Sequence, residues 1–172
     1  MKKYATTFGG SEFTVDDPIY QDGIKLGKYL ASKGYTVKNG GYYGLMEAVS
    51  KGVVESGGQC IGITNASFDP KPANQFITEE IKAKDLFDRL RLLIQSSELF
   101  VIQNGSIGTV DELCVTWCLR YTLTMPSIRI CLIGGFWRQV LYGLQNLAIK
   151  KEEFDILEIY KDIEDFSDSF RC

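Results

Sequence analysis

The sequence LFVIQNGSIGTVDE, residues 99–112, contains a strand, a glycine loop and the start of a helix in direct succession. Its first four residues, Leu99–Ile102, are the most strand-like run of the chain. Gly105 and Gly108 let the backbone turn, and helical spacing of apolar residues returns over 109–121. A strand that passes through a glycine loop into a helix is the repeating unit of a parallel α/β sheet.

The same unit recurs on both sides of this stretch. The pattern predicts strands at 4–8, 35–38, 60–64, 128–133 and 156–160. It predicts helices at 17–34, 44–56, 84–95 and 136–148, with a short acidic helix near the end and a surface loop at 66–81 that holds at most one edge strand. In the first helix, Asp17 is the expected N-cap, Pro18 the first helical residue and Gly34 the stop. We therefore expect a Rossmann-like, doubly wound, mainly parallel sheet in three α/β/α layers.

Length and composition place this sheet in one globular domain, residues 1–172. The chain has 172 residues, 45% of them hydrophobic, and no apolar run approaches the roughly 18 residues of a membrane-spanning helix. The first residues, MKKYATTFGG, lack the apolar core of a signal peptide. We expect a cytoplasmic protein with no membrane partner.

Histidine is absent from the chain, which removes several kinds of chemistry. Ser-His and Cys-His nucleophile pairs and His-ligated metals are excluded, so carboxylates, Lys, Arg, Tyr or Cys must do any catalysis. The five cysteines show no CxxC spacing and read as reduced, buried thiols, with Cys114 and Cys118 as core or interface thiols: Cys60, Cys114, Cys118, Cys131 and Cys172. Neither a metal site nor a cofactor is expected.

The net charge of −3 is unevenly distributed. Residues 151–172 hold eight acidic and three basic side chains, which leaves the first 150 residues at +2. A nucleic-acid binder would carry a clustered basic stripe, so that class of partner is disfavoured. A slightly positive body with an acidic C-terminal segment leaves room for one small anionic ligand.

Three glycine joints follow predicted strands and supply the candidate ligand loops. The carboxyl ends of parallel strands share one edge of the sheet, where main-chain N–H groups and helix N-termini, each worth about half a positive charge, attract a phosphate. Tight strand-to-helix turns are the alternative reason for any single joint. The candidate residues are Gly10, Ser11, Gly40, Gly41, Tyr42, Gly44, Gly105, Ser106, Gly108 and Thr109. None of the joints is a GxxxxGK[ST] loop or a clean GxGxxG, which disfavours triphosphate hydrolysis and nicotinamide binding.

These joints resemble motifs of the LOG (Lonely Guy) family of nucleotide phosphoribohydrolases, also called possible lysine decarboxylases. NGGYYGLM (39–46) is similar to that family's GGGxxGLM, NGSIGTVDE (104–112) to its PGGxGTxxE, and FGGS (8–11) to its FCGS start. Its MHxRK element is reduced to LFDRL (86–90), which keeps Arg89 fifteen residues before Asn104 and has Phe87 and Leu90 in place of histidine and lysine.

The resemblance implies hydrolysis of the N-glycosidic bond of a nucleoside 5′-monophosphate, with a purine as the expected base, to free base and ribose 5-phosphate. Glu112 would stabilise the cationic sugar and activate water, and Arg89 would face phosphate or base. The loop at 105–109 would hold the 5′-phosphate, no cofactor is needed, and a homodimer with the 113–123 helix at its contact is expected. Lysine decarboxylation is disfavoured because no lysine lies at a recognisable pyridoxal phosphate site.

Each assignment has a structural alternative. Thr109 and Glu112 have the spacing of a capping box, and Arg89 has the i,i+4 spacing of a surface ion pair with Asp85. Tyr42 and Tyr43 either stack on a base or pack on a neighbour. At the level of function, the alternative is a noncatalytic protein of the same superfamily that binds a nucleotide or a phosphorylated cofactor, and a smaller share goes to another reaction at the same site.

Overall fold

Seven strands form one sheet in the computed structural model, which describes residues 2–65, 67 and 71–171. The strand order is β4-β3-β2-β1-β5-β6-β7, and every neighbouring pair is parallel. The expected mainly parallel sheet is therefore parallel throughout. The strands are β1 (Lys3–Phe8), β2 (Tyr35–Asn39), β3 (Cys60–Thr64), β4 (Glu79–Lys82), β5 (Leu99–Ile102), β6 (Arg129–Ile133) and β7 (Leu157–Tyr160).

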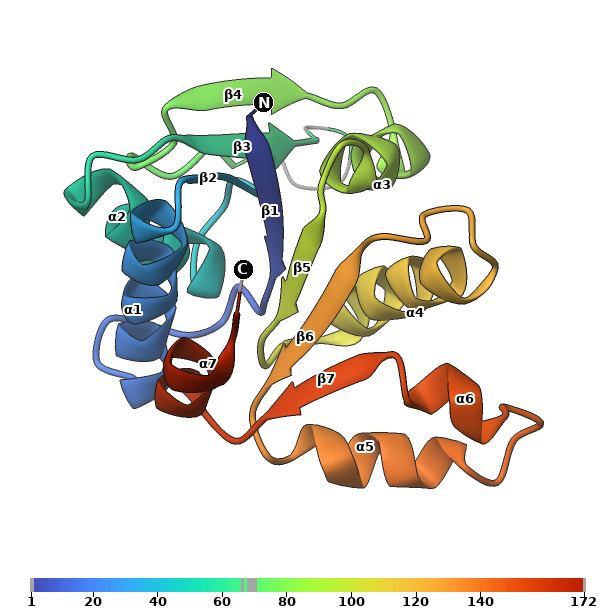
Figure 1. Ribbon diagram of the computed structural model, residues 1–172. Coiled ribbons are helices and arrows are strands. Elements are labelled where there is room, and N and C mark those ends of the chain that lie inside the picture. Colours follow the sequence, from blue (N-terminus) through green and yellow to red (C-terminus); the bar gives the residue numbers. More distant parts are fainter. Residues whose placement is uncertain (1, 66, 68–70, 172) are drawn as a thin grey trace.

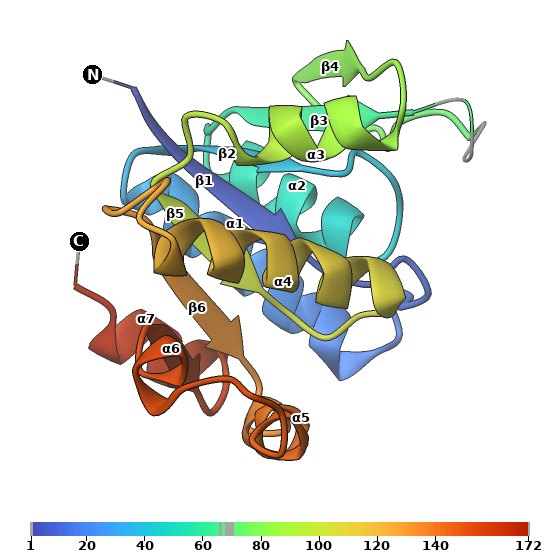
Figure 2. The same ribbon diagram turned by 90° about the vertical axis from the view of Figure 1, so that its right-hand side faces the viewer.

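Helices cover both faces of the sheet, as Figures 1 and 2 show. This arrangement confirms the three α/β/α layers. One face carries α1 (Pro18–Ser32), α2 (Leu45–Glu55) and α7 (Ile163–Ser169). The other carries α3 (Leu86–Ile94), α4 (Ile107–Tyr121), α5 (Trp137–Leu144) and α6 (Lys151–Phe154).

The central strands are buried on both sides because helices cover both faces of the sheet. All four residues of β5 are buried, and β2 and β3 are buried along their full length. One cluster packs the sheet against α3, α4 and α5, and the other packs it against α1, α2 and α7.

The strand order reverses between β1 and β5, and this point positions the site. The chain winds outward from β1 to β4 and then returns to β5 on the other side of β1. Phe8 and Ile102 are register partners, so the two strands end level with each other. The backbone N–H of Gln103 donates to the Phe8 carbonyl at 2.9 Å, which holds the loops after β1 and β5 side by side. Ligands of doubly wound folds bind in the crevice at such a point.

Local differences from the predicted elements have identifiable causes. Helix α4 begins at Ile107, two residues before the expected start, because Ser106 adopts the extended conformation of an N-cap. Asp17 is the N-cap residue of α1 but makes no side-chain cap bond; its carboxylate accepts from the backbone N–H of Thr14 at 2.7 Å instead. The helix expected to reach residue 148 ends at Leu144, and α6 was not predicted.

The cysteines decide between two alternatives. Cys60 and Cys131 are buried, as predicted. Cys114 and Cys118 are exposed on the outward side of α4, so they are not core thiols, and their place at an interface stays a prediction. Cys172 and parts of the loop at 66–81 lie outside the described residues. Within the described part of the chain, no helix is long and apolar enough to cross a membrane.

Candidate functional site

The three glycine joints meet backbone to backbone at the carboxyl edge of the sheet. The N–H of Gly10 donates to the Asn104 carbonyl at 2.9 Å, and the N–H of Leu45 donates to the Gly10 carbonyl at 2.9 Å. A Cβ on Gly44 would lie 2.5 Å from that carbonyl oxygen, and a Cβ on Gly105 would lie 2.9 Å from the Gly10 nitrogen. Both glycines are therefore needed for close packing of the loops.

A cleft of about 190 Å³ opens where these loops meet. Nine of the twelve predicted site residues line it: Gly10, Ser11, Gly40, Tyr42, Arg89, Ser106, Gly108, Thr109 and Glu112. The remaining three, Gly41, Gly44 and Gly105, are not among the lining residues. Gly41 and Gly44 have φ of +78° and +67°, values that favour glycine, so they shape the loop behind the cleft.

Asn39 fixes the loop after β2. Its side-chain oxygen accepts from the N–H of Gly41 at 2.8 Å, and its amide nitrogen donates to the Met46 carbonyl at 3.1 Å and the Ser50 hydroxyl at 3.0 Å. This residue stands where the LOG motif has glycine. The Asn39 side chain therefore joins the start of this loop to α2 by hydrogen bonds.

Arg89 is buried at the inner wall of the cleft. Only 9% of it is exposed, and its Nε donates to the Ile63 carbonyl at 2.8 Å, while one terminal nitrogen donates to the Gly40 carbonyl at 3.3 Å. Asp85 instead caps α3 by accepting from the Asp88 N–H at 2.8 Å. The predicted surface ion pair between Arg89 and Asp85 is therefore wrong, because the Arg89 guanidinium is turned toward the sheet.

Residue 40 must be glycine for Arg89 to lie where it does. A Cβ on Gly40 would approach a terminal nitrogen of Arg89 to 2.1 Å and the Met46 sulfur to 2.6 Å. The glycine therefore gives the guanidinium its place at the cleft wall.

The Tyr42 ring packs near the Arg89 guanidinium. The tyrosine is 3% exposed, its hydroxyl donates to the Asn65 carbonyl at 3.1 Å and accepts from the Asn65 N–H at 2.8 Å, and its ring centroid lies 5.8 Å from the guanidinium carbon. Packing is thus the observed role of Tyr42, and stacking on a base stays a prediction. Tyr43 is 37% exposed and does not line the cleft.

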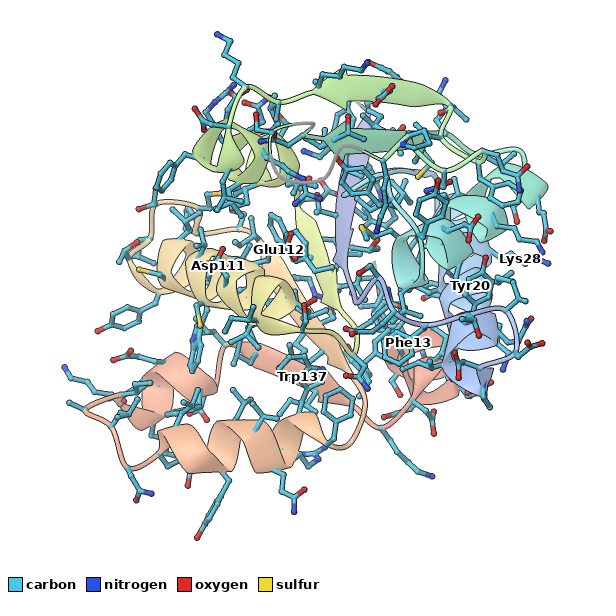
Figure 3. All side chains as sticks on the ribbon, turned by 180° about the vertical axis from the view of Figure 1, so that it is seen from behind. Phe13, Tyr20, Lys28, Asp111, Glu112 and Trp137 are labelled. Carbon is cyan, nitrogen blue, oxygen red and sulfur yellow. The ribbon has the colours of Figure 1, made fainter. Side chains whose placement is uncertain are left out.

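Glu112 reaches the cleft from the second turn of α4, beside Asp111 and on the side of the helix nearer α3 (Figure 3). The capping-box interpretation is wrong, because Ser106 is the N-cap and Thr109 already lies inside the helix. Burial raises the pKa of Glu112 to about 8; the positive charge of Arg89 acts against this rise and the negative charge of Asp111 adds to it. The cleft therefore holds a carboxyl group that is mostly protonated at pH 7 in the absence of a ligand.

The N-terminus of α4 forms one end of the cleft. Ser106, Gly108 and Thr109 line it, and the Ser106 side chain makes no cap bond to the first turn. The N–H groups of that turn have no partner within the helix, and the dipole of a 15-residue helix adds positive potential there.

Four further lining residues were not predicted, namely Thr7, Phe8, Gly9 and Met46. Phe8, Gly9 and Met46 belong to the motif stretches, but nothing in their spacing distinguishes a cleft wall from core packing. No lysine lines the cleft in the described part of the chain, and no group of three potential metal ligands occurs among the residues described.

The fold and the cleft together define a Rossmann-like protein with a cleft at its topological switch point. The sequence profile of the SLOG cluster4 family matches residues 2–133. The chain belongs to that family, and its resemblance to LOG proteins is confirmed.

Curated relatives carry phosphoribohydrolase names. A probable cytokinin riboside 5′-monophosphate phosphoribohydrolase of Oryza sativa subsp. japonica is 35% identical over 128 residues, which are 72% of this chain and 52% of that protein. A cytokinin riboside 5′-monophosphate phosphoribohydrolase of Rhodococcoides fascians is 30% identical over 130 residues, 73% of this chain and 65% of that protein. The chain thus spans about half to two thirds of the length of these relatives.

Solved structures share the fold over nearly the whole chain. The structural-genomics protein TM1055 is 28% identical and superimposes with a TM-score of 0.73. The match covers 96% of this chain and 95% of the TM1055 chain. A molybdenum cofactor binding protein of Rippkaea orientalis has a TM-score of 0.75 at 20% identity, covering 96% and 93%. At that identity the second likeness concerns the fold alone.

Proposed function

We propose that this protein hydrolyses the N-glycosidic bond of a purine nucleoside 5′-monophosphate, releasing the base and ribose 5-phosphate. The observation that carries the proposal is that Arg89, Glu112 and the first turn of α4 line one cleft. A cation, a carboxyl group and an anion-binding helix end are the three groups this reaction requires. The names of the relatives support the same reaction class.

The phosphate is assigned to the first turn of α4. Its N–H groups, which have no partner within the helix, and the hydroxyls of Ser106 and Thr109 are donors for phosphate oxygens. With the phosphate there, the sugar extends toward Glu112, one turn further along the helix. This orientation presents C1′ to the carboxyl group.

Glu112 is assigned the chemical step. As the C1′–N bond breaks, the base leaves with the bonding electron pair and takes up a proton from solvent, and C1′ becomes cationic. Water adds to C1′, and the Glu112 carboxylate accepts the proton that this water loses. The same negative charge stabilises the cationic sugar.

Arg89 is assigned to binding rather than to proton transfer. Its guanidinium supplies a fixed positive charge and planar N–H donors for phosphate or base. Its bonds to the carbonyls of Ile63 and Gly40 fix its position before the ligand arrives.

Noncatalytic binding of a nucleotide or a phosphorylated cofactor is the second candidate. Arg89 is the one basic side chain lining the cleft among the described residues, since Phe87 and Leu90 stand at the family's histidine and lysine positions. Phe87 is 82% exposed and does not line the cleft. A site with fewer charged groups still holds an anion, and proteins named for molybdenum cofactor binding share this fold.

A homodimer is proposed as the assembly. The outward side of α4 presents Cys114, Cys118 and Tyr121, which border an apolar hollow of about 290 Å³ together with Leu144 and Leu147. A helix that is apolar on its exposed side as well as its buried side is typical of an interface. A second copy is the partner that the family resemblance implies.

The experiment is a paired panel of nucleoside 5′-monophosphates and the matching nucleosides, with free base and ribose 5-phosphate quantified by chromatography. We expect base release from at least one monophosphate, in equal amounts with ribose 5-phosphate, and none from its nucleoside. Tight binding of a monophosphate without any base release would refute hydrolysis and establish the binding function.

A further inference from the structure

A second and larger cavity opens at the same edge of the sheet, on the other side of the loop after β5. Its volume is about 390 Å³, roughly twice that of the cleft, and it lies where β6 and β7 end and α1 begins. The two cavities share no lining residue. Its size falls within the range of about 300–1,000 Å³ that is typical of small-molecule sites.

Gln103 gives this cavity a polar side chain with no hydrogen-bond partner among the described residues. The residue is 5% exposed and lines the cavity, and its side-chain amide makes no hydrogen bond to any described residue. A Cβ on Gly9 would lie 3.1 Å from the amide nitrogen, so the glycine leaves the amide its space. A buried amide carries two donors and one acceptor, and leaving them unpaired is unfavourable. The amide is therefore available to a bound molecule.

Phe136 gives the same cavity an aromatic wall. Gly134 has a φ of +124°, and a Cβ there would lie 2.2 Å from the Phe136 ring, so only glycine lets the ring fold over this turn. The ring is backed by Trp137, whose centroid is 5.2 Å away and which lies buried at the start of α5 (Figure 3). Phe136 itself is 38% exposed and lines the cavity. A fixed, partly open aromatic face is suited to stacking on a planar ring.

The rim of the cavity is acidic. Asp22 and Asp162 line it, with Lys161 as the one basic lining residue among those described. Asp22 lies 3.2 Å from Lys25, and Asp162 lies 3.8 Å from Lys161 and also accepts the Asp165 N–H at 2.9 Å. Two carboxylates disfavour a phosphate and favour a ligand with amino or ring N–H groups.

We propose that this second cavity binds a free nucleobase, stacked on Phe136 and hydrogen-bonded along one edge to the Gln103 amide. A purine or pyrimidine presents donors and acceptors side by side, which matches the amide, and carries no charge for the acidic rim to repel. This cavity is separate from the proposed hydrolytic cleft. The proposal does not depend on whether that cleft hydrolyses a nucleotide.

The test uses adenine as the probe and measures binding to the full chain by calorimetry and by ¹H–¹⁵N NMR. The Gln103 side-chain signals are assigned by their loss in Gln103→Leu. We expect saturable shifts of these signals and at least a tenfold loss of affinity in Gln103→Leu and in Phe136→Ala. Tyr142→Ala, which removes a 71% exposed aromatic of α5 outside the cavity, is the matched control and should bind adenine normally.

Two results would overturn the proposal. One is adenine binding that is absent or unchanged in Gln103→Leu, which would mean that water satisfies the amide. The other is an affinity for adenine that falls in Glu112→Gln instead, which would locate the base in the first cleft. If Gln103→Leu fails to fold, Gln103→Glu keeps the shape and removes both donors, and the same tenfold loss is expected.

Discussion

Glu112 determines how the proposed activity depends on pH. Its pKa is raised to about 8, so about one tenth of the molecules hold the carboxylate at pH 7 and about nine tenths at pH 9. Because the carboxylate is the form that accepts the proton of water, the rate of base release should rise about tenfold over this interval. The substrate phosphate is already doubly charged across this range and does not contribute. Single-turnover rates from pH 6 to pH 10 measure this pH dependence of base release. A flat or falling profile would exclude the Glu112 carboxylate as the base.

Glu112 should also lower the free energy of unfolding as the pH rises. A carboxyl group whose pKa is raised by folding stabilises the native state at low pH, and this contribution is lost as pH rises from about 4.5 through about 8. Glu112→Gln has no such loss, so its advantage in unfolding free energy should grow from pH 5 to pH 8 and then level off. We expect a gain on the order of 1 kcal/mol at pH 8, reduced from the full shift because the cleft admits solvent. Denaturant titrations of both proteins at several pH values test this predicted gain. A Glu112→Gln variant less stable than the wild type at pH 8 would contradict the burial of Glu112.

At the scale of single elements, α3 is held to the sheet at its C-terminus. Lys38 of β2 donates to the carbonyls of Leu92 and Gln95 at 2.9 and 2.6 Å, and Thr6 of β1 donates to the Leu93 carbonyl at 2.7 Å. Burial lowers the pKa of Lys38 to about 8. These bonds satisfy carbonyls that a helix end leaves unpaired, and they hold the helix that carries Arg89.

Removing one of these bonds should loosen α3. Thr6→Val leaves both the Leu93 carbonyl and the Ser97 hydroxyl without this buried partner, and we expect a loss of about 1–2 kcal/mol with faster amide exchange at the end of α3. Ser32→Ala is the matched control, because it removes an exposed hydroxyl bonded to the Tyr29 carbonyl and should cost less than about 0.5 kcal/mol. Equal losses in the two variants would show that the Thr6 bond does not anchor the helix.

The sequence allowed the elements with strong local patterns to be predicted. The bounds of β3 and β5 agree with the predicted strands, because apolar runs between turn signals leave few alternatives. The two sides of α4 could not be told apart from the sequence, and so the core and an interface both stayed open for Cys114 and Cys118. The role of Asn39 was also out of reach, since its three bonds depend on residues that only the fold brings near.

The candidate site was predictable where a motif carried it. The glycine loops indicated the position of the cleft, and the match to LOG motifs pointed to Arg89 and Glu112. The direction of each side chain was not predictable, because capping-box and ion-pair spacings are equally compatible with surface positions. Tertiary packing decided both, by turning Arg89 toward the sheet and by starting α4 at Ile107.

At the scale of the whole molecule, the exposed apolar side of α4 and α5 predicts self-association. Tyr121 is 44% exposed and Leu147 58%, and both border the hollow beside Cys118. Tyr121→Glu places a charge in this surface and should shift a dimer to monomer in sedimentation equilibrium, with little effect on the fold. Gln21→Glu on the exposed part of α1 is the control for added charge. A wild-type chain that stays monomeric at high concentration would refute the dimer.

The most direct test of the central claim compares the wild type with Glu112→Gln on the same nucleoside 5′-monophosphate, measuring binding and base release in parallel. Removing the carboxylate should lower the rate of base release by about 100-fold or more while the dissociation constant changes less than about tenfold. That result would assign Glu112 to the chemical step. Equal rates of base release in the two proteins, or no release from a wild-type protein that binds the nucleotide, would contradict the proposed reaction.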